Sequence, residues 1–130
     1  MKRVIIESPF AGNCNLNVAY ARLAVRHSLS LGEAPIASHL LYTQYTILDD
    51  NNNHERQWGI DAGLAWKHVA EKQIFYIDLG WSNGMKYAKE FCVSHNIEIE
   101  ERRILSESEF KELLDKHPND NSLIVMLQNK

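Results

Sequence analysis

A carboxylate stands where the first apolar segment of the chain ends. Residues 3–8 are short, β-branched and almost continuously apolar, which is typical of a strand covered on both faces, and Glu7 lies near their end. A carboxylate in that position loses hydration unless a cation or a ligand compensates its charge. Glu7 is therefore either paired with a cation such as Arg56 or placed to act on a ligand, and we favour the ligand.

The loop after this segment carries groups that can surround a sugar or a base. Pro9 and Gly12 stop the strand, and the glycine makes the backbone flexible. Phe10 offers an aromatic face. The residues of this loop that we expect to bind a ligand are Ser8, Pro9, Phe10, Gly12 and Asn13.

A second polar loop follows the predicted strand at residues 73–78, with Asp78 as a further catalytic candidate. Its ligand-binding candidates are Gly80, Trp81, Ser82, Asn83 and Gly84. Ser82 suits a helix N-cap, and the free N–H groups and dipole of a helix that begins there favour an anion such as phosphate. Purely structural alternatives remain open: Ser82 as a cap alone, Gly84 as a close-packing residue, and Asp78 as the cap of the turn at Gly80.

One histidine is a candidate for chemistry. A short strand is predicted at residues 34–39, so its final residues Ser38 and His39 would reach toward the same crevice as the two loops. No pair of histidines has the spacing of metal ligands, so we expect neither a metal nor another cofactor.

Alternating strands and helices position these residues. Helices are predicted at residues 17–31, with Asn17 as N-cap and Gly32 as the stop, and at 55–70, 82–95 and 107–116; further strands are predicted at 97–99 and 123–127. Residues 40–48 receive no assignment, residues 49–55 are interpreted as a surface loop, and residues 98–103 as a solvated edge. The alternation predicts the α/β class, a three-layer sandwich around a mostly parallel sheet of about five strands. Ligands bind such sheets outside the carboxyl ends of the strands.

Composition excludes several classes of function. With 130 residues and 45% hydrophobic residues, the chain can close one core, so we expect residues 1–130 to form a single domain. Lys and Arg total 14 against 17 Asp and Glu, which leaves no positive field for a nucleic acid polymer. No apolar stretch approaches the roughly 20 residues that cross a membrane. Without an apolar leader, and with two cysteines, the expected location is the cytoplasm.

The same loops resemble a known group of proteins. Val4-Ile5-Ile6-Glu7-Ser8-Pro9-Phe10 resembles the opening strand and Ser-Pro-Phe turn of the nucleoside 2-deoxyribosyltransferase-like group, within the Rossmann-like nucleotide-processing proteins. Residues 74–85 resemble the group's Ser-x-Gly helix start, which implies that Ser82 to Gly84 hold the phosphate or sugar end of a nucleoside or nucleotide. The resemblance covers roughly the first 95 residues, and its short motifs indicate fold more than activity. Residues 7–12, 32–44 and 59–66 together are also similar to a family of small phage and bacterial proteins.

The chain departs from that group at one position. In the group's transferases and N-glycosidases, a Glu one turn into the helix after the Ser-x-Gly start attacks the anomeric carbon, and this chain has Ala88 there. Glu90 lies about 200° around the helix and so faces elsewhere. Glu7 occupies a place where the group has a small residue and is the leading substitute. Asp78 or Asp61 would orient the sugar or assist proton transfer.

Two functions follow as hypotheses. The first is an enzyme acting on a base–sugar bond, an N-glycosidase or deoxyribosyltransferase, with Glu7 as nucleophile or base and Phe10 or Trp81 against the base. The second is a non-catalytic protein that senses or sequesters a nucleotide-like ligand in the same pocket. Ala88 favours binding, whereas a desolvated carboxylate at Glu7 favours catalysis, and we place the enzyme first.

The helix predicted at residues 55–70 indicates self-association. Its apolar residues cover more than half of its circumference, which is more than one sheet face covers. Either another subunit or residues 40–48 cover the remainder. We expect a homo-oligomer in which Tyr42, Gln44 or Arg56 enters a neighbour's site.

Overall fold

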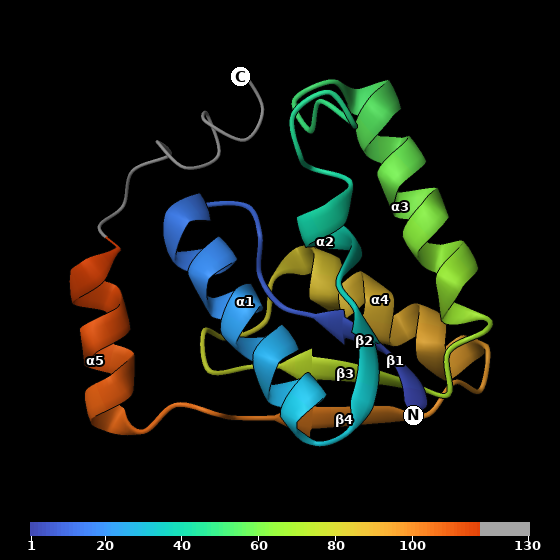
Figure 1. The fold of residues 1–130 in the computed structure, drawn as a ribbon. Helices are drawn as coiled ribbons and strands as arrows, with labels where there is room; N and C mark the ends of the chain where they lie inside the picture. Colours follow the sequence, from blue (N-terminus) through green and yellow to red (C-terminus); the bar gives the residue numbers. More distant parts are fainter. Residues whose placement is uncertain (118–130) are drawn as a thin grey trace.

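The computed structural model describes residues 1–117, and they form a parallel sheet with helices on both faces (Figure 1). The strands are β1 (Lys2–Glu7), β2 (Glu33–Ile36), β3 (Lys72–Tyr76) and β4 (Ile99–Arg102), in the spatial order β2-β1-β3-β4. Every pairing is parallel. The predicted α/β class is confirmed, with four strands among the described residues. The strand predicted at residues 123–127 lies outside them.

Successive side chains of β3 point to opposite faces of the sheet, and helices pack on each face. Ile74 and Tyr76 pack with Tyr20 of α1 (Cys14–Ser30), and α5 (Glu107–Lys116) joins the same core cluster. Phe75 and Ile77 point to the other face, where they pack against α4 (Asn83–Ser94). Figure 1 shows α3 (Asn53–Lys67) standing away from the sheet, and it contacts the short α2 (Ser38–Leu41). No helix within residues 1–117 is both long and apolar enough to span a bilayer.

The first helix begins one turn earlier than predicted. Asn13, rather than Asn17, is its N-cap, because the Asn13 side chain accepts a hydrogen bond from the Leu16 N–H at 3.3 Å. The Asn17 amide instead donates to the carbonyls of Phe10 and Ala11, each at 2.9 Å, and so fixes the loop after β1. The stop is where it was predicted, since Gly32 follows the helix with φ +79°.

Other boundaries differ for similar local reasons. The strand predicted at residues 34–39 is wrong at its end, because β2 stops at Ile36 and residues 38–41 form α2. The helix predicted at 55–70 begins at Asn53, where the side chain of Asn52 accepts from the His54 and Glu55 N–H groups. The fourth strand lies at Ile99–Arg102 rather than at 97–99. The caps at Ser82 and Ser106 are confirmed.

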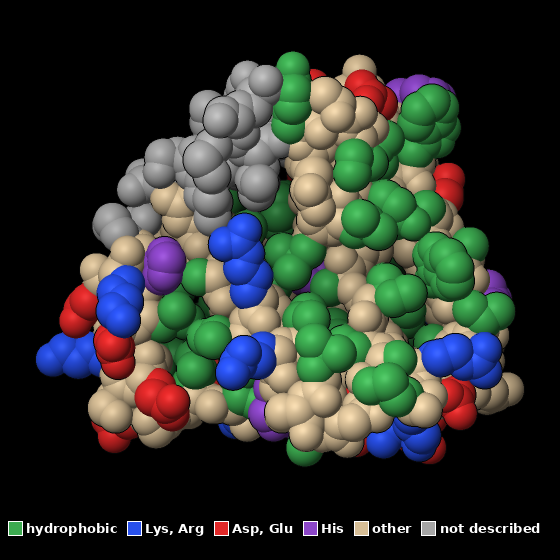
Figure 2. All heavy atoms as spheres, viewed as in Figure 1, with side chains coloured by type: hydrophobic (Ala, Val, Ile, Leu, Met, Phe, Trp, Pro, Cys, Tyr) green, Lys and Arg blue, Asp and Glu red, His purple; other side chains and the backbone are tan. Residues whose placement is uncertain are grey.

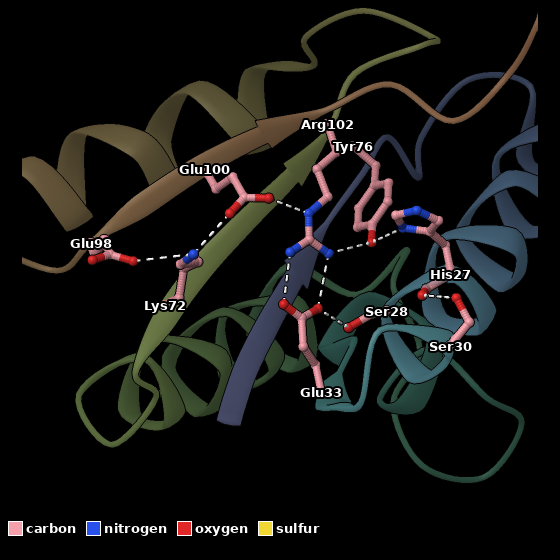
Figure 3. Close-up of polar contacts among 9 residues, drawn as sticks. All are labelled: His27, Ser28, Ser30, Glu33, Lys72, Tyr76, Glu98, Glu100 and Arg102. Atoms are coloured by element: carbon pink, nitrogen blue, oxygen red, sulfur yellow. Dashed lines mark hydrogen bonds and ion pairs between the residues drawn. The ribbon is translucent and has the colours of Figure 1, made fainter. Parts of the chain in front are cut away.

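The charged segment at β4 is an edge strand, but its last residue is not solvated. Arg102 donates two hydrogen bonds to the Glu33 carboxylate, at 2.9 and 2.7 Å, and one to the Tyr76 hydroxyl at 2.9 Å (Figure 3). A further bond reaches Glu100. The side chain of Arg102 is only 10% exposed. Because Arg102 and Glu33 belong to the two edge strands of the described sheet, the pair bridges the sheet across β1 and β3. The guanidinium of Arg102 lowers the pKa of Glu33 from 4.5 to about 2.

Replacing Glu33 tests this bridge. Glu33→Gln removes the carboxylate that accepts two of the Arg102 hydrogen bonds and leaves Glu100 as the remaining counter-charge, so we expect the free energy of unfolding at pH 7 to fall by about 3 kcal/mol. The folded-state pKa of Glu33 is depressed, so its stabilisation is present above pH 4.5 and is lost as the pH falls toward about 2. The difference between wild type and variant should therefore narrow across that window in urea unfolding experiments.

Glu112→Gln is the matched control. Glu112 pairs with Lys116 on an exposed helix surface, and its loss should change the free energy of unfolding by less than about 0.5 kcal/mol. A Glu33→Gln effect that stayed constant from pH 7 to pH 3 would contradict the bridge.

Candidate functional site

A cavity of about 530 Å³ lies where the carboxyl end of β1 meets the first turn of α4. Its size is within the range of roughly 300–1,000 Å³ that holds small ligands. The predicted site residues that line it are Glu7, Ser8, Phe10, Gly12, Ser38, His39, Ser82, Asn83 and Gly84. Three stretches that are far apart in the sequence therefore meet at one cavity.

Asp78 does not line this cavity, although we predicted a catalytic role for it. Its carboxylate accepts hydrogen bonds from the Tyr20 hydroxyl at 2.6 Å and from the N–H groups of Ile104 and Leu105 at 2.9 and 3.1 Å. Burial, followed by this hydrogen bond, raises the pKa of Tyr20. Asp78 thus anchors α1 and the segment after β4 to the end of β3. Its position fits the structural alternative rather than the catalytic one.

Four predicted binding residues also lie outside the cavity lining: Pro9, Asn13, Gly80 and Trp81. Asn13 caps α1, and Gly80 adopts a positive φ of 86° in the turn after β3. The Trp81 ring packs on Phe75 with ring centroids 4.9 Å apart, and Lys89 Nζ lies over the Trp81 ring, 5.0 Å from its centroid. Trp81 is therefore part of the packing between β3 and α4, and Phe10 is the predicted aromatic residue that reaches the cavity.

Glu7 has a cationic partner that sequence reasoning missed. Lys67, the last residue of α3, donates to Glu7 Oε1 at 2.7 Å, with the two side chains 3% and 15% exposed. Arg56, the partner we considered, lies instead 4.0 Å from Asp50 at a more exposed part of the lining. Lys67 follows Ile60 and Leu64 at helical spacing, and a lysine within an apolar stripe was the signal that a buried anion faces it.

The second polar pair in the cavity wall joins Ser8 to His39. Ser8 Oγ and His39 Nε2 are 2.8 Å apart. Burial lowers the pKa of His39; the charge of Glu7 opposes this shift and the charge of Lys67 adds to it, and the net direction is downward. The imidazole is therefore held neutral. Within residues 1–117, the buried His39 Nδ1 has no hydrogen-bond partner. We predicted His39 at the end of a strand, but it lies in α2. It nevertheless reaches the predicted edge of the sheet.

The first turn of α4 presents backbone donors to the cavity. Ser82 Oγ accepts from the Met85 N–H at 3.2 Å, which leaves the amides of Asn83 and Gly84 outside the helix's own hydrogen bonds. A Cβ atom at Gly84 would approach only Ser82 Oγ, at 3.9 Å, so close packing does not require this glycine. Ala88 lies one turn farther along and also lines the cavity. Sequence reasoning had not placed Asp50, Met85 or Tyr87 in this wall.

Comparison with protein families gives one match. A family model described as a domain of unknown function, DUF7768, matches residues 2–102. This span includes the four strands and every residue that lines the cavity. No curated protein and no solved structure matches the chain.

Removing the cation of the buried pair should destabilise the fold. Lys67→Met leaves the Glu7 carboxylate buried without a partner, and we expect a loss of about 3–5 kcal/mol in the free energy of unfolding. The double variant Glu7→Leu with Lys67→Met replaces both charges by apolar groups, so it should recover most of that loss. Urea unfolding of the two single variants and the double variant measures the coupling. If the losses of the two single variants simply added up in the double variant, the two side chains would not interact.

The neutral state of His39 predicts a pH dependence. Because its folded-state pKa lies below 6.5, the unfolded chain binds a proton that the folded state excludes, and stability should decline as the pH falls below about 6.5. His39→Gln should remove this part of the slope, whereas His54→Gln, at an exposed position of α3, should retain it. An NMR titration that gave His39 a pKa above 6.5 would refute this assignment.

Proposed function

The chain belongs to the DUF7768 family of domains of unknown function, and we propose that it binds a nucleotide-like small molecule in its cavity and acts on the base–sugar bond. One observation carries the proposal: the strand-end carboxylate of Glu7 and the amino end of α4 line the same cavity. A nucleotide has an anionic end and a reactive anomeric carbon. A protein that acts on it therefore needs one group that binds the anion and another that attacks the carbon. The resemblance of residues 4–10 and 74–85 to the nucleoside 2-deoxyribosyltransferase-like group supports the same choice.

The amino end of α4 suits the anionic end of the ligand. The amides of Asn83 and Gly84 and the helix dipole favour a phosphate or an oxygen-rich sugar end there. Arg56, in the same lining, is a further donor for an anion, and Asp50 beside it offsets its charge. Phe10 offers an aromatic edge or face to a base.

Glu7 is the group proposed to do chemistry. A Glu7 carboxylate oxygen attacks the anomeric carbon, the bond from that carbon to the base nitrogen breaks, and the base leaves with the bonding electrons and takes up a proton from water. Water, or a second base, then attacks the same carbon and restores the carboxylate. Lys67 compensates the negative charge that returns to Glu7 when this ester is cleaved.

Binding without catalysis is the second candidate, and two observations favour it. Ala88 lies in the cavity wall at the position where the resembling group carries its nucleophile. Glu7 is already engaged by Lys67, and a carboxylate held by an ammonium is a weaker nucleophile than a free one. In this case the same groups hold the ligand unaltered.

The deciding experiment follows free base. The protein is incubated with a panel of nucleosides, 2′-deoxynucleosides and their 5′-monophosphates, and released base is quantified by chromatography while binding is measured by calorimetry. Catalysis predicts release that falls by roughly a hundredfold or more in Glu7→Gln. Glu90→Gln, which removes an exposed carboxylate from the same helix as Ala88, is the control and should leave the rate unchanged.

The outcomes distinguish catalysis from binding alone, and they distinguish both from a protein that does neither. Calorimetric binding with no release of base supports the non-catalytic function. Release that survives Glu7→Gln overturns the role given to Glu7. The absence of both binding and release across the whole panel overturns the proposal of a nucleotide-like ligand.

A further inference from the structure

The outer side of α3 is apolar and exposed among residues 1–117. Of its fifteen residues, only Gly63 and Lys67 are buried, and both face inward. Trp58 is 57% exposed, Trp66 47% and, just beyond the helix, Val69 51%. We call the surface formed by Trp58, Ala62, Ala65, Trp66 and Val69 the α3 face.

The segment between α2 and α3 extends this surface and does not cover it. Trp66 donates from Nε1 to the Tyr42 hydroxyl at 3.2 Å, and the backbone of Gly59 lies close to Leu48, so residues 42–48 run beside α3. Leu41, Tyr45 and Ile47 remain exposed there. Figure 2 shows hydrophobic side chains gathered over this part of the molecule. Large contiguous apolar patches on a protein surface are typical of places where another molecule binds.

We propose that a second copy of this chain covers the α3 face, with the two α3 helices packed antiparallel about a twofold axis near Ala62. Ala62 lies midway between Trp58 and Trp66 in the sequence. In an antiparallel pair centred there, each Trp58 meets Trp66 of the other copy while the small alanine side chains cross at the centre. The pattern of large, small and large residues is therefore complementary to itself, as a twofold interface requires.

The charges of α3 favour a second copy over a membrane surface. A helix that lies on a bilayer has lysines and arginines along its polar side. In α3 the cations are Arg56, next to Asp50, and Lys67, which is buried against Glu7. The nearest carboxylate to the centre of the face is Asp61, and it accepts from Gln57 at 2.9 Å on the same helix. Within α3, therefore, the exposed cation Arg56 has a carboxylate beside it, and Lys67 is withdrawn from the surface where lipid headgroups would lie.

This interface would also support the cavity. The inner side of the same helix contributes Ile60, Leu64 and Lys67 to the cavity wall. Packing of the outer side against a second copy would hold that wall in place from behind. The inference stands without the proposed ligand, because the mass of the assembly is measured with none present.

Molecular mass tests the proposal first. Light scattering after size exclusion should give the wild type at micromolar concentration twice the 15.0 kDa of one chain. Ala62→Arg places a charge at the centre of the interface, so it should weaken association by roughly tenfold or more and give a monomer. Val93→Arg, at an exposed position on a different helix, α4, is the matched control and should remain a dimer. Circular dichroism of both variants verifies that they are folded.

Cross-linking tests the geometry independently. If the twofold axis passes near Ala62, then Ala62→Cys should be joined to its own counterpart by a short bis-maleimide, in a chain whose native Cys14 and Cys92 provide the background. Val93→Cys should give no more linked dimer than the wild type does. The proposal is overturned by a wild-type monomer at high micromolar concentration, by a dimer that Ala62→Arg leaves intact, or by binding to anionic vesicles that Ala62→Glu abolishes.

Discussion

The cavity depends on the ion pair between Lys67 and Glu7. Lys67 is the last residue of α3 and Glu7 the last of β1, so their bond at 2.7 Å ties the outlying helix to the sheet. An apolar pair of similar volume would serve the fold at least as well, because burying two charges costs much of what their attraction returns. The chain nonetheless keeps charged groups in the wall of this cavity, which is where a ligand would use them.

A second ion pair stabilises the opposite face of the sheet. Arg102 lies beside Tyr76, whose ring belongs to the core under α1, whereas Glu7 lies beside Phe75, which packs toward α4. The ion pairs on the two faces therefore lie in different surroundings. The bridge from Arg102 to Glu33 joins the edge strands of the described sheet, while the pair of Glu7 and Lys67 lies in the wall of the cavity.

The features that sequence reasoning predicted well are those set by neighbouring residues. Serine caps at 82 and 106, the glycine stop at 32 and the apolar run of β1 depend on contacts within a few residues, so they are visible in the sequence. The convergence of the loops after β1 and β3 follows from parallel pairing alone. Competing caps caused the errors at helix starts, since Asn13 and Asn17 are both suitable and only the fold of the loop decides between them.

The partners of buried charges could not be predicted, because they are 60 to 69 residues apart in the sequence and only tertiary packing selects them. Asp78 shows the same limit, since its acceptors are used by Tyr20, Ile104 and Leu105, which no local pattern links to it. Lys67 is the instructive residue. Its place in an apolar stripe is explained by the two sides of α3. The inner side faces the cavity, where Lys67 pairs with Glu7, and the outer side is apolar. An amphipathic pattern with a lysine on its inner side thus indicates a helix that encloses a polar site rather than one that merely covers a core.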